Sequence, residues 1–91
     1  MQLTSQDREQ VRLCILRYCL RPTSVGLIVA NLRGEGFRGI SREQVQQEIR
    51  YLSDPAKGLL AAQQKLVSPE NAIHETTANG RDYLAQQGQE E

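Results

Sequence analysis

The chain has 91 residues, enough for one hydrophobic core but too few for a catalytic domain joined to a regulatory one. Its eleven basic and eleven acidic side chains cancel, so binding to nucleic acid or anionic lipid must depend on a local patch. The N-terminus lacks the features of a signal peptide, and no apolar run approaches the roughly 18 residues that span a bilayer. These features predict a small cytoplasmic protein that is not an enzyme.

Apolar spacing predicts a first helix over residues 4–20. Thr4 or Ser5 can cap it, and the apolar side chains that follow recur every three or four residues, as on one buried helix face. Additional leucines make this apolar stripe wider than one core face requires. The excess favours a second packing surface, such as a homodimer contact. The widening residues are Leu13, Leu16 and Leu20.

Two further helices are predicted before residue 54. The second covers residues 24–33 and ends at the glycines of 34–39. The third covers residues 41–53, where Ser41 and Gln44 match a capping box and an apolar stripe lies on one side only. Asp54 precedes a proline and therefore ends it. The stripe consists of Val45, Ile49 and Leu52.

The segment after Pro55 can be interpreted in two ways. Residues 59–67 have good helix formers, yet a turn signal around Pro69 is followed by a short β-branched stretch that reads as a strand. A strand of that length needs a neighbour, and 59–67 is the nearby candidate. We therefore predict an antiparallel hairpin over 59–76, with a helix over 59–67 as the alternative.

Asn79-Gly80 is also ambiguous, because this dipeptide favours a two-residue hairpin turn. If the preceding residues form a strand, Thr77 can instead cap a last helix over 77–87. Gly80 then lies in the first turn of that helix, where its missing side chain lets the helix pack closely against the strand.

Few residues suggest chemistry. Cys14 and Cys19 lie too far apart around a helix to form a bridge, and we expect two reduced, buried thiols. With one histidine they are too few for a zinc site. His74 alternates with Ile73, which predicts a surface position. The G-x-G-x-x-G match at 34–39 follows a helix rather than a strand, so it predicts no nucleotide site, and we expect no cofactor and no metal.

The order of these elements resembles a winged helix-turn-helix domain over about residues 8–87. "VQQEIRYL" followed by "KGLL" looks like the recognition helix of that family running into its first wing strand. "IHETTANGRDYL" (73–84) is similar to its usual exit from the wing, Leu-Thr-x-x-Gly-x-x-x-Leu. Small proteins of this kind occur among bacterial regulators of the MarR and PadR type and in Mu-like phages. The resemblance implies an α+β fold in which three helices precede a two-stranded wing and a short C-terminal helix.

The resemblance also implies that the third helix enters the DNA major groove and that the wing touches adjacent backbone. Arginine can bind guanine and glutamine can bind adenine there, while further cations contact phosphates. The opposing observation is a weak charge excess, since residues 33–65 hold six basic and four acidic side chains. Among the acidic ones, Glu43 and Glu48 would repel phosphates. The candidate DNA-binding residues are Arg38, Ser41, Arg42, Gln46, Gln47, Arg50 and Lys65.

The expected function is a DNA-binding transcriptional regulator acting as a homodimer through the first and last helices. The alternative is a winged helix that binds protein, for instance an adaptor in a phage or other multiprotein assembly, since a fold does not settle a function. No membrane or small-molecule partner is indicated.

Overall fold

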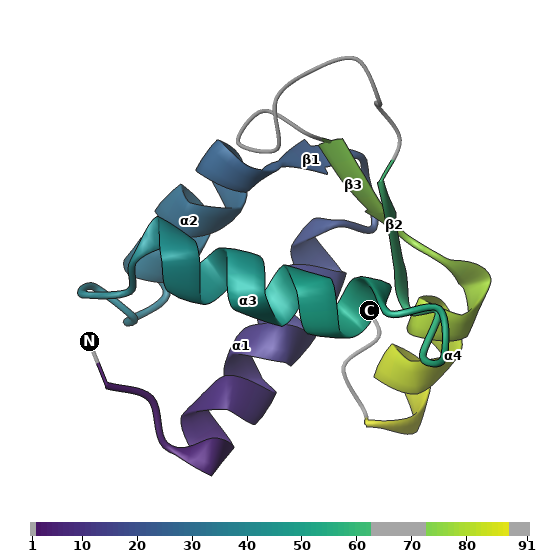
Figure 1. The fold of residues 1–91 in the computed structure, drawn as a ribbon, viewed down its shortest axis with the longest axis horizontal. Helices are drawn as coiled ribbons and strands as arrows, with labels where there is room; N and C mark the ends of the chain where they lie inside the picture. Colours follow the sequence, from purple (N-terminus) through teal and green to yellow (C-terminus); the bar gives the residue numbers. More distant parts are fainter. Residues whose placement is uncertain (1, 63–72, 88–91) are drawn as a thin grey trace.

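A computed structural model describes residues 2–62 and 73–87 of the chain, and these residues form an α+β structure of four helices and a small antiparallel sheet (Figure 1). The predicted α+β class is confirmed. The helices are α1 (Ser5–Tyr18), α2 (Val25–Gly34), α3 (Arg42–Ser53) and α4 (Ala78–Gln86), and the strands are β1 (Thr23–Ser24), β2 (Leu60–Ala62) and β3 (Ile73–Thr76).

Each helix begins at a side-chain cap that the sequence contains. The hydroxyls of Thr4, Ser24, Ser41 and Thr77 each accept a hydrogen bond from the backbone N–H three residues further on. Thr4 and Ser41 belong to complete capping boxes, because a side chain in the first turn also accepts from the cap backbone. The predicted helix starts therefore agree with the structure to within one residue.

The sheet has the order β1-β3-β2, so the last strand in sequence lies in the middle. Leu60 pairs with Thr76 and Ala62 with His74, which confirms strand rather than helix for residues 60–62. The rest of the predicted hairpin, residues 63–72, lies outside the described part of the chain. β1 was not predicted, since two residues before a helix cap have no periodicity, yet Thr23 pairs with His74 on the other side of β3.

The start of α4 resolves the ambiguity at Asn79-Gly80 in favour of the helix. The Gly80 N–H donates to the Thr77 hydroxyl at 3.1 Å, and that hydroxyl donates to the Gly58 carbonyl. A Cβ atom on Gly80 would collide with the Leu59 carbonyl oxygen and the Thr76 methyl group. Glycine is therefore required where α4 begins beside the end of β3, as predicted, and it also makes room for Leu59, the residue before β2.

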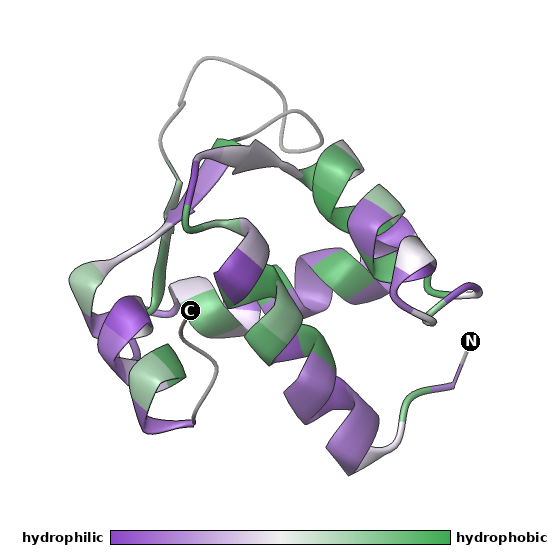
Figure 2. Ribbon diagram, turned by 180° about the vertical axis from the view of Figure 1, so that it is seen from behind, coloured by the Kyte–Doolittle hydropathy of each residue, from purple (hydrophilic) through white to green (hydrophobic). Residues whose placement is uncertain are grey.

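The core lies between the helices and one face of the sheet, and apolar residues of all four helices reach it (Figure 2). Leu13 and Leu16 are buried within the chain, and Leu20 packs against the same core. The predicted second packing surface of α1 is present, and it lies within the chain. One chain uses the whole stripe, because β3 and α4 also pack on α1.

The predicted surface position of His74 is wrong. His74 alternates with Ile73, but it is the His74 side that turns inward, with 8% of the residue exposed. The buried face of β3 is defined by the Thr76 hydroxyl, which donates to the Leu16 carbonyl at 2.7 Å, and His74 lies two residues away on that face. Cys14 and Cys19 are free and buried, as predicted, and burial raises the pKa of Cys19 to about 12.

Candidate nucleic-acid interface

α3 has one face in the core and one face that the described chain leaves exposed. Figure 1 shows it crossing α1, with α2 near its first turn and β2 near its last. Val45, Ile49 and Leu52 are buried, as the apolar stripe predicts. The opposite side presents polar residues. A helix held by one face in this way can offer the other to a partner.

The structure brings four of the predicted site residues to the polar side of α3. Arg42, Gln47 and Arg50 are exposed, and Gln46 is half-buried. Arg42, Gln46 and Arg50 follow one another at intervals of four residues, which aligns them along the helix. Glu43 is exposed on the same side, so one carboxylate remains among these groups.

The other predicted residues lie beside this face or outside the described part. Ser41 is exposed, but its hydroxyl accepts a hydrogen bond from the Gln44 N–H at 3.1 Å and thereby caps α3. Arg38 is exposed in the turn before α3. Lys65 lies in the range 63–72 that the structure does not describe. Arg33, counted among the nearby cations, uses two guanidinium nitrogens to bind the Ile40 carbonyl at 2.9 and 3.1 Å.

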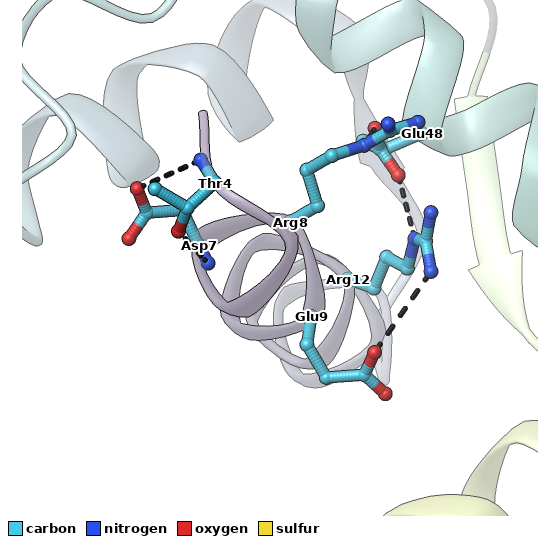
Figure 3. Close-up of polar contacts among 6 residues, drawn as sticks. All are labelled: Thr4, Asp7, Arg8, Glu9, Arg12 and Glu48. Atoms are coloured by element: carbon cyan, nitrogen blue, oxygen red, sulfur yellow. Dashed lines mark hydrogen bonds and ion pairs between the residues drawn. The ribbon is translucent and has the colours of Figure 1, made fainter. Parts of the chain in front are cut away.

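Glu48 corrects the expectation that it repels phosphates from this face. Only 2% of its side chain is exposed, and it points toward α1 (Figure 3). Arg8 Nε lies 3.0 Å from one of its carboxylate oxygens, and Arg12 Nε lies 2.6 Å from the other. The negative charge is therefore matched inside the molecule and does not belong to the exposed face of α3. Sequence spacing could not reveal this, because its partners lie 36 and 40 residues away.

The C-terminal end of α3 carries an aromatic side chain held by two cations. Arg12 Cζ lies 3.7 Å from the centroid of the Tyr51 ring, and Lys57 Nζ lies 4.4 Å from it. These distances are typical of cation–π contacts. Tyr51 is 41% exposed and, with Leu27, is one of the two large apolar or aromatic side chains that the described part of the chain leaves exposed. Spacing within α3 could not indicate this role of Tyr51, because both cations come from outside the helix.

Two hollows adjoin α3. The first, of about 460 Å³, is polar and lies between the N-terminal segment and α3, with Arg8, Gln47 and Glu48 in its lining. The second, of about 250 Å³, lies beside Tyr51 and is lined also by Leu59 and Tyr83. Burial is the main cause that raises the pKa of Tyr83, and the hydrogen bond with Glu9 raises it further. The Tyr83 hydroxyl therefore stays protonated at neutral pH and donates to the Glu9 carboxylate at 3.1 Å.

Two chemical features are absent from the described residues. No group of three or more His, Cys, Asp or Glu side chains within 2–62 and 73–87 could hold a metal ion. In the same part of the chain, no helix has the length and apolar character needed to cross a membrane.

No protein-family model and no curated protein matches this chain.

Proposed function

We propose that this protein is a winged-helix DNA-binding protein that inserts α3 into the major groove and regulates transcription. One observation carries the proposal: α3 is held by its apolar side while Arg42, Gln46, Gln47 and Arg50 occupy the side that the described chain leaves uncovered or half-covered. Arginine and glutamine can form paired hydrogen bonds with guanine and adenine edges there.

The arrangement of elements is compatible with the proposal. α2 and α3 are followed directly by the antiparallel strands β2 and β3, which would form the base of a wing. β2 contacts α3, and Leu59 just before β2 donates to the Leu52 carbonyl near the C-terminal end of α3. A wing built on β2 and β3 could reach DNA backbone from there, next to the groove that the helix would occupy.

The charge distribution is compatible with the proposal, because Glu48 does not lie on the exposed face of α3. Glu48 faces α1 and is paired with two arginines, so the carboxylate that opposes phosphates on α3 is Glu43. Arg38, Arg42 and Arg50 are exposed on or just before this helix. The face therefore keeps the excess of two positive charges that the count along residues 33–65 gives, but concentrates it on fewer residues.

The homodimer belongs to the proposal as well, with two copies reading half-sites about one helical turn apart. The leucines of α1 no longer argue for it, because Leu13 and Leu16 are buried in the chain's own core. The dimer now follows only from the resemblance to dimeric regulators. Light scattering with and without a selected duplex would measure it directly.

Selection from a random duplex library, followed by binding at several salt concentrations, tests the proposal. A protein making about four phosphate contacts should lose affinity with a log–log slope near −3.6. Arg50→Ala or Gln46→Ala should change the selected sequence, at a cost of about 1 to 3 kcal/mol for a true base contact. Arg21→Ala, which removes an exposed cation from the connection between α1 and β1, is the control and should keep the sequence preference.

Two results would contradict the proposal in whole or in part. Absence of duplex binding at low salt would reject the proposal and favour the protein-binding adaptor. Binding that weakens equally for every duplex when Arg50 or Gln46 is replaced would retain DNA contact but reject base reading by α3.

A further inference from the structure

Glu48 attaches α3 to α1 at two points. Arg8 and Arg12 lie one turn apart on α1, and each binds a different oxygen of the same carboxylate through its Nε atom (Figure 3). A single contact would let the carboxylate turn about the bond that joins the partners. Two contacts from successive turns define its orientation relative to the axis of α1.

Arg12 extends the attachment along α3. Its guanidinium binds Glu48 at 2.6 Å and lies 3.7 Å from the centroid of the Tyr51 ring, three residues further along the same helix. The Arg12 side chain is only 17% exposed. It also lies 3.9 Å from Glu9, which binds the Tyr83 hydroxyl of α4. The Arg12 side chain of α1 thus contacts Glu48 and Tyr51 on successive turns of α3, and Glu9 contacts Arg12 from α1 itself.

Stability alone does not explain the buried Glu48 carboxylate, which pairs with the largely buried Arg12 and the half-exposed Arg8. Apolar side chains of similar volume often stabilise a core as well as a buried ion pair does, because burial of charges costs desolvation energy. Apolar contacts are also non-directional, so they restrict the rotation of α3 about its own axis less than hydrogen bonds do. The distinctive contribution of the cluster is therefore geometric.

A small rotation of α3 would matter for reading bases. Side chains extend a helix to a radius of about 5 to 6 Å, so a turn of about 10° moves its surface by about 1 Å. Hydrogen-bond lengths vary by only about 0.5 Å around their usual value. A shift of that size would separate Gln46 or Arg50 from a paired base contact and would leave less demanding phosphate contacts in place.

We propose that Arg8, Arg12 and Glu48 are positioning residues that fix the rotation of α3 and so set which base edges its exposed face can read. This inference depends on the proposed DNA binding for its functional consequence. Its structural part, the fixed rotation of α3 relative to α1, applies to the free protein as well.

The test uses the double variant Arg12→Met with Glu48→Met, which removes one positive and one negative charge and keeps apolar volume. Arg21→Met with Asp82→Met, at exposed positions outside α1 and α3, is the control with the same change in charge. Selectivity is measured as the ratio of affinities for the selected and a scrambled duplex, at a temperature where both variants are fully folded. We expect selectivity to fall about tenfold or more in the first variant, with an unchanged salt slope, and to stay constant in the control.

Residual dipolar couplings of the free protein give a second readout that needs no DNA. We expect the α3 amide vectors of the first variant to rotate relative to those of α1, and those of the control to match the unmodified protein. Unchanged couplings and unchanged selectivity in a folded double variant would overturn the inference. If the unmodified protein binds no duplex, the proposed function fails, and the couplings still decide whether the cluster positions α3.

Discussion

At the scale of single residues, His74 predicts how stability depends on pH. It is 8% exposed, its Nδ1 atom has no hydrogen-bond partner in the described structure, and burial lowers its pKa. The unfolded chain takes up a proton at a pKa of about 6.5, above that of the folded state. The contribution of neutral His74 to the free energy of unfolding is therefore fully present above about pH 6.5. It is lost as the pH falls toward the folded-state pKa, by at most about 1.4 kcal/mol per pH unit.

Urea unfolding at about pH 7.5 and about pH 5.5 measures this effect in a range where most carboxylates stay ionised. The His74→Leu variant provides the control, because it keeps a buried side chain and removes the titrating ring. Its stability should change much less between the two pH values. Equal pH dependence in both proteins would show that His74 does not cause the loss.

Gly80 gives a second prediction for a single residue. Glycine to alanine within a helix usually stabilises by up to about 1 kcal/mol. At Gly80 the new methyl group would collide with the Leu59 carbonyl and the Thr76 side chain, so we expect Gly80→Ala to destabilise by about 1 to 3 kcal/mol. At Gly34, where a Cβ meets nothing within 4 Å, the same change should be neutral or stabilising. Thermal unfolding of the two variants compares them, and equal effects would contradict the close approach.

Sequence spacing could not predict the burial of residues whose partners lie far along the chain. Glu48 lies at the edge of the apolar stripe of α3, and only its pairing with Arg8 and Arg12 of α1 makes burial of the carboxylate favourable. His74 lies in a strand of four residues. Ile73 is its one aliphatic residue, and the sequence therefore predicts the wrong face of the strand as the buried one. Gly80 was predicted correctly because its role depends on the adjacent cap and strand.

At the scale of elements, helices were easier to predict than strands. Caps such as Ser41 with Gln44 are local, and the apolar stripe of α3 extends over about two turns. Both the start of α3 and its buried face could therefore be predicted from spacing. β1 consists of two residues, and it is defined by the pairing of Thr23 with His74 and of Ser24 with Ile73, about fifty residues further along the chain. No local pattern could have indicated it.

The two faces of α3 predict opposite results for adjacent residues. Ile49 is 5% exposed in the core, so Ile49→Ala should destabilise the protein by about 2 to 4 kcal/mol. Arg50 is exposed on the other face, and Arg50→Ala should change stability by no more than about 0.5 kcal/mol. Denaturant unfolding measures both. A large loss of stability for Arg50→Ala would mean that this face is covered, which would remove the basis of the proposed DNA contact.

At the scale of the whole molecule, the C-terminal segment closes the structure onto α1. The Thr76 N–H donates to the Cys19 carbonyl at 2.8 Å, and Arg81 donates to the Leu20 carbonyl at 3.3 Å. Tyr83 reaches Glu9 in the first turns of the same helix. α1 therefore packs against α3 on one side and against β3 and α4 on another, which accounts for its wide apolar stripe without a partner chain.

The buried Thr76 hydroxyl tests this closure, because it donates to the Leu16 carbonyl across a separation of 60 residues. Thr76→Val keeps the shape of the side chain and removes the donor, so we expect a loss of about 1 to 2 kcal/mol in the free energy of unfolding. Thr77→Ser, the control, keeps the hydroxyl that caps α4 and should stay within about 0.5 kcal/mol. In the unmodified protein the Thr76 amide should exchange with solvent only on global unfolding. Faster exchange of this amide would show that β3 and α4 separate from α1 while the remaining helices stay folded.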